Sequence, residues 1–279
     1  MIFDALSPCK LNLFLYITGK LPNGYHALQT LFVVLDYGDK MHFEVTENDK
    51  VSLLTDFGFS VEKNLIYKAA MILKEKCNCH KGVEISIDKV LSQGGGLGGG
   101  SANAATTLSV LNKLWDLNLD EKTLIEYGAL LGADVPIFIK GCSCFGEGIG
   151  EKLVEVDYPQ KYYLVATPDC SVPTAKLFSS DKLVKDSPVR SYQELLSLPF
   201  KNCFTPVVVN EYPKVQELLD TLSKYGNAYM SGSGSSCFVA FDDFEIAKRA
   251  QKEILANGTK CFIARSVDKS SILKKLETF

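Results

Sequence analysis

The spacing of apolar residues along the chain changes between the period of two typical of strands and the spacing of three to four typical of helices. Residues 10–17 and 28–35 are apolar-rich runs that predict strands, and a Pro-Asn-Gly turn at 22–24 lies between them. Apolar and polar residues alternate over 83–90, which indicates a half-buried strand. Further strands are predicted at residues 41–45, 51–54 and 237–241.

Helical spacing dominates the segments between these runs. Residues 64–76 carry apolar side chains three to four positions apart, and Asn64 is a suitable N-cap. A small-residue helix is predicted at 102–115, and a second at 121–131 ends at Gly132. Amphipathic helices are also predicted at residues 214–225 and 244–256. Because strands and helices do not alternate strictly, the pattern favours an α+β fold over a doubly wound sheet.

Length and composition narrow the class of protein. The 279 residues are 46% hydrophobic, enough for a large core, and a change in composition near residues 147–159 predicts two domains, 1–150 and 151–279. The net charge of -3 provides no cationic surface for nucleic acid. No signal peptide and no apolar run of about 20 residues is visible, so no membrane partner is expected. Nine cysteines without a regular pattern suit a reducing compartment, and we expect a cytoplasmic protein that acts on a small molecule.

A glycine-rich loop is the most informative motif in the sequence. It reads GGGLGGGSANAA from Gly94 to Ala105 and lies between a predicted strand and a predicted helix. Glycine allows the backbone to approach a ligand closely, and the N-terminus of the following helix presents free N–H groups with a positive dipole end. This arrangement binds phosphate, and a flexible linker would not lead directly into an apolar helix.

Other glycine-rich phosphate motifs fit less well. A Walker loop requires Gly-Lys followed by Ser or Thr, and the loop contains no lysine. Gly94, Gly96 and Gly99 match the dinucleotide fingerprint with Asp116 near the required offset, but no convincing βαβ context precedes them. The tripeptide Asp-Phe-Gly at 56–58 occurs in protein kinases, but here it precedes the glycine loop and no His-Arg-Asp lies upstream.

Two cysteine pairs raise the alternative of a metal site. Cys77-x-Cys79-His80 and Cys142-x-Cys144 have one intervening residue, whereas zinc sites commonly have two to four. In a strand, this spacing only places both thiols on one face. We therefore interpret these cysteines as small buried hydrophobic residues and predict no metal bound by the protein alone.

The loop and two further motifs resemble the GHMP kinases. GGGLGGGSANAA is similar to the phosphate loop of that family, and the Ser-Gly-Ser-Gly run at 231–234 is similar to its third motif. Residues 7–28 and 132–136 resemble the members that phosphorylate the 2-hydroxyl of a cytidine diphosphate derivative of methylerythritol in non-mevalonate isoprenoid synthesis. The resemblance covers nearly the whole chain. It implies a two-domain GHMP kinase fold with the active site in the cleft between the domains, ATP as phosphoryl donor, and Mg²⁺ carried with the ATP.

The resemblance also implies roles for particular residues. Asp134 matches the catalytic base and Lys10 the catalytic lysine, while Asn12, on the same strand face as Lys10, is expected to hydrogen-bond the substrate or Asp134. Tyr25 and Phe178 would sandwich the cytosine, and His26 would hydrogen-bond its edge. The ATP site would comprise Asn64, Leu65, Lys89, Gln93, Gly94, Gly95, Gly96, Leu97, Gly98, Gly99, Gly100, Ser101 and Ala102.

Three other functions remain open from the sequence. Another GHMP kinase, such as a homoserine kinase, would share the loop but not the cytidine-containing substrate. A nucleotide sensor built on the same fold would have no use for Lys10 and Asp134 beside the γ-phosphate. An NAD-dependent oxidoreductase is the third alternative, because the loop matches the dinucleotide fingerprint formally.

Overall fold

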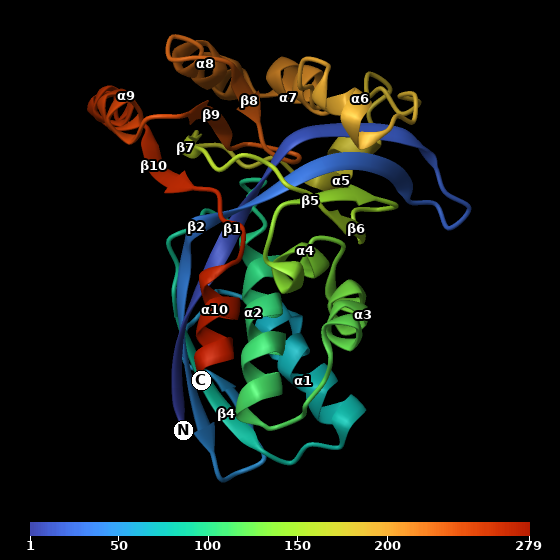
Figure 1. The fold of residues 1–279 in the computed structure, drawn as a ribbon, viewed down its shortest axis with the longest axis vertical. Coiled ribbons are helices and arrows are strands. Elements are labelled where there is room, and N and C mark those ends of the chain that lie inside the picture. The colour runs from blue at the N-terminus through green and yellow to red at the C-terminus, as the bar shows by residue number, and fades with distance from the viewer.

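The computed structural model describes residues 1–279, and two β-sheets form its framework (Figure 1). The first sheet has six strands in the order β3-β4-β2-β5-β6, with β1 paired to β2. These strands are β1 (Ile2–Lys20), β2 (His26–Thr46), β3 (Val51–Leu53), β4 (Gly82–Asp88), β5 (Cys144–Glu147) and β6 (Lys152–Glu155). The second sheet has four antiparallel strands in the order β10-β7-β9-β8. These are β7 (Tyr162–Thr167), β8 (Ala228–Met230), β9 (Cys237–Phe241) and β10 (Lys260–Arg265).

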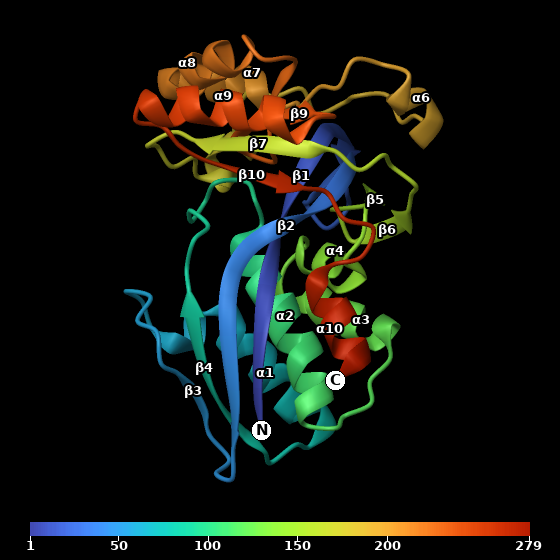
Figure 2. The same ribbon diagram turned by 60° about the vertical axis from the view of Figure 1, so that its left-hand side comes forward.

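The long hairpin of β1 and β2 runs through the whole molecule (Figure 2). The sequence predicts two strands, 28–35 and 41–45, where the structure has the single strand β2. The polar and glycine residues at 36–40 read as a break, but 38–40 pair with residues 6–8 of β1, and 36–37 lie at a register shift within the continuous strand. Gly38 makes this pairing possible, since a Cβ at that position would lie 1.8 Å from the carbonyl oxygen of Ser7.

One face of the first sheet is covered by helices (Figure 2). Asn64 caps the first of them by accepting a 2.9 Å hydrogen bond from the Ile66 N–H, as the sequence predicts. The helix after the glycine loop begins at Gly99, three residues earlier than predicted, because the loop glycines themselves enter the first turn. The helical elements of this layer are η1 (Val61–Lys63), α1 (Leu65–Cys77), α2 (Gly99–Leu114), α3 (Glu121–Leu131), α4 (Val135–Lys140) and α10 (Ser271–Thr278).

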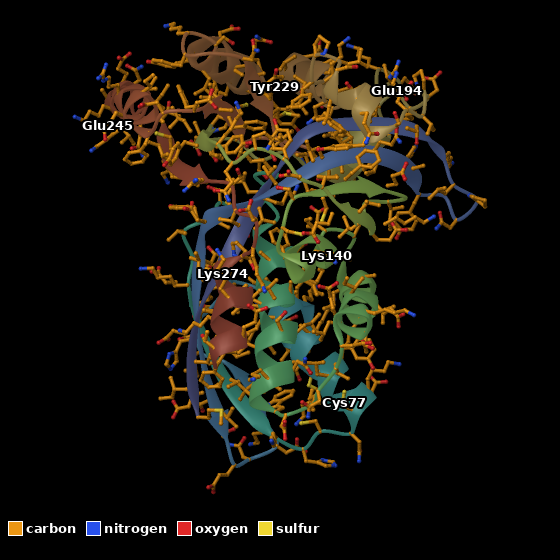
Figure 3. All side chains as sticks on the ribbon, in the orientation of Figure 1. Cys77, Lys140, Glu194, Tyr229, Glu245 and Lys274 are labelled. Atoms are coloured by element: carbon orange, nitrogen blue, oxygen red, sulfur yellow. The ribbon has the colours of Figure 1, made fainter.

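Because successive side chains of β2 point to opposite faces of the first sheet, this strand packs against the helices on one side and against the second sheet on the other. Phe32 and Val34 point into the core beneath the helices, whereas Leu31, Val33 and Leu35 point to the other face and pack against the second sheet. The second sheet is covered on its outer side by helices, and charged side chains such as those of Glu194 and Glu245 lie on the outside (Figure 3). These helices are α5 (Thr174–Phe178), α7 (Thr205–Glu211), α8 (Pro213–Leu222) and α9 (Phe244–Ala256). The remaining helix, α6 (Tyr192–Leu196), places Leu195 in the core between the two sheets.

The division into domains 1–150 and 151–279 stays a prediction. Residue 150 lies between β5 and β6, which pair as a hairpin of the first sheet. The chain enters the second sheet only at Tyr162, and the C-terminal α10 returns to the first core through Ile272. We therefore propose a boundary between residues 155 and 162, with α10 assigned to the first domain. None of the helices combines the length and hydrophobicity required to cross a membrane.

Candidate active site

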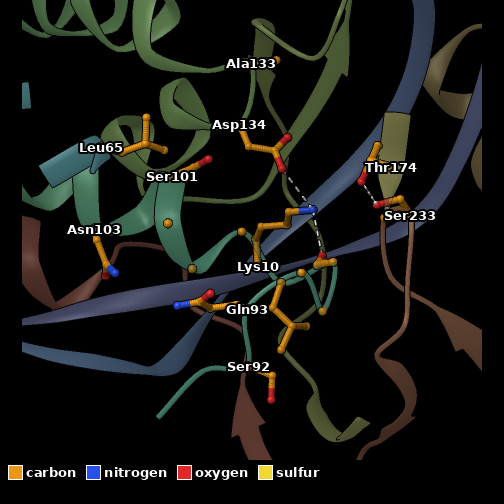
Figure 4. Close-up of a pocket in the computed structure, with 18 of the residues that line it drawn as sticks. Lys10, Leu65, Ser92, Gln93, Ser101, Asn103, Ala133, Asp134, Thr174 and Ser233 are labelled. Carbon is orange, nitrogen blue, oxygen red and sulfur yellow. Dashed lines mark hydrogen bonds and ion pairs between the residues drawn. The ribbon is translucent and has the colours of Figure 1, made fainter. Parts of the chain in front are cut away.

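A cavity of about 590 Å³ opens between the β1–β2 hairpin, the glycine loop, the α3–α4 junction and the loop that precedes β9 (Figure 4). Most of the residues that the sequence analysis selected line this one cavity. They are Lys10, Asn12, Asn64, Leu65, Lys89, Gln93, Gly94 to Gly100, Ser101, Asp134 and Phe178. The fold therefore gathers residues from the beginning, middle and end of the chain around a single space.

Three of the selected residues do not line the cavity. Tyr25 lies on the exposed hairpin turn, and its side chain is 62% exposed. His26 lies beside it at the start of β2. Ala102 is fully buried among the core residues of α2, and its N–H already bonds to Gly98 O at 2.8 Å. Its methyl group thus faces the core and its N–H has an intrahelical acceptor, and the assignment of Ala102 to the ATP site stays a prediction.

The glycine loop has the conformation that phosphate binding requires. Gly94, Gly96 and Gly98 alternate along the loop and have φ values of 69°, 76° and 74°. At Gly96 a Cβ would lie 2.2 Å from the carbonyl oxygen of Ser231, so glycine is required there for contact as well as conformation. Such alternation of backbone conformation forms a concave array of N–H groups suited to anions.

The N-terminus of α2 completes this array. Gly98 is its N-cap, and the first intrahelical bond is the one donated by Ala102, so the N–H groups of Gly99, Gly100 and Ser101 precede the helical ladder. The first turn contains no acidic residue that would oppose an anion. The polar side chains near this end include the Ser101 hydroxyl and the amines of Lys10 and Lys89, which suits a triphosphate.

Lys10 and Asp134 face each other across the cavity (Figure 4). Lys10 Nζ lies 3.4 Å from Asp134 Oδ2 and donates hydrogen bonds to Asn12 Oδ1 and, at 3.0 Å, to Gly96 O. The lysine side chain is 3% exposed and that of Asp134 is 38% exposed, so the cation is held by protein groups while the carboxylate can reach a ligand. A carboxylate in this position can accept or orient a hydroxyl proton, and the cation can neutralise charge on a transferred phosphoryl group.

The local structure leaves the Asp134 carboxylate free for chemistry. Asp134 is the N-cap residue of α4, and Pro136 follows in the first turn of that helix. Aspartate at this position commonly caps the helix through its side chain, but here the side chain makes no capping hydrogen bond. Instead, it points into the cavity toward Lys10. A purely structural capping role is therefore excluded by the geometry.

Asn12 acts mainly on Lys10 in this structure. Its Oδ1 accepts from Lys10, and its Nδ2 donates to Thr30 Oγ1 at 2.9 Å. Its backbone N–H donates to Ser231 Oγ at 3.2 Å, and that hydroxyl donates to Gly96 O at 3.0 Å. The third motif, the glycine loop and β1 are thus joined by hydrogen bonds around Lys10, and no bond from Asn12 to Asp134 is formed.

Several lining residues were missed by the sequence analysis. Phe57 and Phe59 stand 6.0 Å apart between their ring centroids near the nucleotide end. At the other end, Thr174 Oγ1 and Ser233 Oγ are hydrogen-bonded at 2.6 Å (Figure 4). Asn103 also lines the cavity, on the first turns of α2. Two of these residues have a signal in the sequence, since Asn103 belongs to the GGGLGGGSANAA motif and Ser233 to the second small-residue loop; the others depend on tertiary contacts.

The aromatic groups expected to hold a cytosine lie near one another at α5 and the start of β2, and their role stays a prediction. Phe178, the last residue of α5, stacks on His26 with centroids 5.0 Å apart and planes 16° from parallel. Its ring edge also packs against Phe204 at 5.1 Å. In this structure His26, rather than Tyr25, therefore covers the open face of the Phe178 ring.

The environment of His26 lowers its pKa below the ordinary value of 6.5. Partial burial against its neighbours is the main cause, and the positive charges of Lys185 and Lys20 act in the same direction. The imidazole is therefore neutral at neutral pH and has one donor and one acceptor nitrogen.

We expect the His26 resonances to titrate with a midpoint below 6.5 in a pH series of NMR spectra, since desolvation and the two lysines oppose protonation. The chain has three histidines, and loss of one signal set in a His26→Gln variant assigns the resonance. A midpoint above 6.5 would contradict the structure around this ring.

The alternatives of zinc binding and dinucleotide binding find no support in the fold. No group of three or more His, Cys, Asp or Glu side chains is arranged to hold a metal ion, and Cys142 and Cys144 are buried in the core with their sulfurs 3.8 Å apart. β3 and β4 pair in parallel with α1 between them, but the glycine loop follows β4, the second strand of this unit, whereas the fingerprint loop of dinucleotide folds follows the first strand.

Comparison with known proteins shows the class of protein to which this chain belongs. The sequence matches the GHMP kinases N terminal domain over residues 64–142 and the GHMP kinases C terminal domain over residues 183–260. The fold also superposes on a homoserine kinase from Cytophaga hutchinsonii with a TM-score of 0.67, 16% identity and coverage of 96% of this chain and 95% of that one. The fold is therefore the two-domain α+β fold of GHMP kinases, as the sequence predicts.

Closer relatives define the family within this class. A protein from Pasteurella multocida (strain Pm70), named 4-diphosphocytidyl-2-C-methyl-D-erythritol kinase, is 43% identical over 266 residues, which cover 95% of this chain and 90% of that protein. A crystal structure of a 4-(cytidine 5'-diphospho)-2C-methyl-D-erythritol kinase superposes with a TM-score of 0.83 and 28% identity, covering 94% of this chain and 98% of that one. The chain belongs to the 4-diphosphocytidyl-2-C-methyl-D-erythritol kinase family.

Proposed function

We propose that this chain transfers the γ-phosphoryl group of ATP to the tertiary 2-hydroxyl of 4-diphosphocytidyl-2-C-methyl-D-erythritol, in the non-mevalonate route to isoprenoid precursors. The observation that carries the proposal is the Lys10–Asp134 pair, which lies beside the glycine loop in one cavity, in a member of this family. We place the reaction in the cytoplasm, where both substrates are dissolved.

The positions of the charged groups suggest how the reaction proceeds. The substrate hydroxyl would lie between Asp134 and the γ-phosphate, give its proton to the carboxylate, and form a bond to phosphorus as the bond to ADP breaks. Lys10, held by Asn12 and Gly96, would neutralise the negative charge that moves through the transferred group. The backbone N–H groups at the start of α2 would hold the phosphates in line.

Mg²⁺ fits this site only as part of the ATP complex. No cluster of three ligating side chains is present, and Asp134 is already paired with Lys10. We propose that the ion would be held by phosphate oxygens and water, and that the Ser101 hydroxyl, which lines the cavity, could supply a protein oxygen ligand. In that position it supplies charge neutralisation of the phosphates.

The cytidine end of the substrate would occupy the region of Phe178. We propose that the cytosine takes the place of His26 on the open face of that ring, with Tyr25 closing over it from the hairpin turn. The neutral imidazole would then be free to hydrogen-bond the edge of the base. Stacking between aromatic rings and bases is favourable and sequence-tolerant, which suits a nucleotide clamp.

The decisive experiment is an assay of ADP release with a panel of alcohols: the cytidine diphosphate substrate, homoserine, mevalonate and galactose. We expect ADP release with the first compound alone. Activity with homoserine would favour the second candidate, a homoserine kinase of the same fold. Normal ATP binding without activity on any alcohol would favour a nucleotide sensor.

A glycine substitution tests the phosphate site separately. A Cβ at Gly100 would have no heavy atom nearer than Leu65 Cδ1 at 3.8 Å, so Gly100→Val should fold normally. Its side chain would stand at the N-terminus of α2 and should raise the Kd for ATP by about tenfold or more. Calorimetry with ATP and a melting curve measure both effects.

Gly98 is less suitable for this test. A Cβ there would lie 2.7 Å from Phe138, and the residue has a φ of 74°, so substitution should lower stability as well as ATP affinity. Gly100→Ala adds a smaller side chain at the same position and is the variant to compare with Gly100→Val. An unchanged Kd for ATP in Gly100→Val would show that the phosphates lie elsewhere.

A further inference from the structure

A fully buried carboxylate lies behind the nucleotide end of the cavity, outside the residues considered so far. Asp39 belongs to β2, and its side chain is 0% exposed. Its Oδ1 accepts backbone hydrogen bonds from Val90 at 2.9 Å and Leu91 at 3.0 Å. Its Oδ2 accepts from Lys89 Nζ and, at 3.1 Å, from Asn103 Nδ2. All four donors therefore point at one carboxylate.

The sequence positions of these donors connect Asp39 to the glycine loop. Lys89, Val90 and Leu91 directly precede the loop, and Asn103 follows it on α2. A single buried side chain thus fixes both ends of the segment 92–102. Burying a charge is costly unless it is paired and hydrogen-bonded, so this carboxylate is held in place only by the full set of donors.

Two of the donors also line the cavity. Lys89 is 24% exposed, so its ammonium can be reached from the cavity while it bonds to Asp39. Asn103 is 3% exposed, and the bond from its Nδ2 to the carboxylate fixes which way the amide is turned. Asn103 Oδ1 is itself buried and has no donor within the protein, so the bond to Asp39 is what holds this side chain.

We propose that Asp39 is a positioning residue for the nucleotide: it orients Lys89 and Asn103 and holds the glycine loop in its binding conformation before ATP arrives. The proposal rests on the ATP site proposed above. Lys89 would give the site a cation, and Asn103 would hold the first turns of α2 against the carboxylate. Because Asp39 contacts neither substrate, it acts through these two side chains and through the loop backbone.

Asp39→Asn tests the proposal with little change in size. The new amide would point a donor at Lys89 Nζ and Asn103 Nδ2, both of which are donors themselves, so the two side chains should turn away. We expect the Kd for ATP, measured by calorimetry without the acceptor alcohol, to rise about 10- to 100-fold. The Kd for the cytidine diphosphate substrate and kcat at saturating ATP should stay within about threefold of the wild type.

A double-mutant cycle with Lys89→Met separates positioning from simple loss of stability. If Asp39 acts through Lys89, the two single variants and the double variant should weaken ATP binding by non-additive amounts. Asp49→Asn is the matched control, since Asp49 is paired with Lys74 on the surface, and it should bind ATP normally.

Three outcomes would overturn the proposal. One is a folded Asp39→Asn with ATP affinity within about threefold of the wild type. Another is an equal loss of affinity for both substrates together with a large fall in Tm, which would make Asp39 a scaffold residue only. If the Asp39→Asn variant fails to fold, normal ATP binding by Lys89→Met would be sufficient to reject the proposal. If the wild type itself does not bind ATP, the proposed function fails rather than this inference.

Discussion

Replacing Asp134 with asparagine should lower turnover by about 10²–10⁴ while leaving the Kd for ATP nearly unchanged. The amide has the same shape as the carboxylate but cannot accept a proton from the substrate hydroxyl. Lys10 would lose a partner at 3.4 Å, yet its hydrogen bonds to Asn12 and Gly96 remain, so the ammonium should keep its place. Single-turnover measurements with excess enzyme isolate this chemical step from product release.

A neighbouring carboxylate provides the control for this variant. Glu121 on α3 pairs with Lys140 at 2.7 Å on the surface, and Glu121→Gln removes a similar charge from a similar ion pair. Turnover of the Glu121→Gln variant should match the wild type. If Asp134→Asn retained turnover within about threefold, the carboxylate would be an orienting or structural group and another base would have to be sought.

Local signals in the sequence were sufficient to predict the helices whose first or last residues are marked by capping residues. The helix over 244–256 has the predicted bounds, because Asp243 caps it and its apolar residues recur on one face. The helix over 121–131 also agrees, with Asp120 at its start and Gly132 at its end. In these elements the boundary is determined by residues adjacent in sequence.

The elements that depend on distant partners could not be predicted in the same way. The continuity of β2 depends on its pairing with β1 and on the absence of a side chain at Gly38, neither of which leaves a local pattern. The short helix α4 has six residues, too few for a helical period, and is held by buried contacts. The packing of α10 on the first core is likewise a tertiary contact.

The residues of the candidate site divide in the same way: some could be recognised from their neighbours in the sequence, and others depend on distant partners. The glycine loop could be recognised from its own residues, since glycine content and the strand-to-helix transition report directly on phosphate binding. Lys10 and Asp134 lie far apart in the sequence, and only family resemblance suggested that they meet. Asp39 gave no signal at all, because a single aspartate in a strand is indistinguishable from a surface residue until its four donors are seen.

Phe178→Ala should raise the Kd for the cytidine diphosphate substrate by about 5- to 150-fold, because stacking on a base contributes roughly 1–3 kcal/mol. Binding of ATP should not change, since Leu65 and Ser101 lie on the opposite side of the cavity from Thr174, the first residue of α5. The structure supports this expectation, since the Phe178 ring is only partly buried and lines the cavity while its edge packs on Phe204.

The neighbouring residue in α5 makes the test selective. Leu177 is 1% exposed and belongs to the core of the second domain, so Leu177→Ala should cost about 2–5 kcal/mol of stability and weaken both ligands together. Both variants are titrated with each nucleotide, and their melting curves are recorded. A residue that clamps the base and a residue of the core predict opposite patterns in these measurements. If Phe178→Ala lost both affinities and melted early like Leu177→Ala, Phe178 would be packing and the cytosine would have to bind elsewhere. Selective loss of the cytidine ligand, with the melting temperature retained, places the base on this ring.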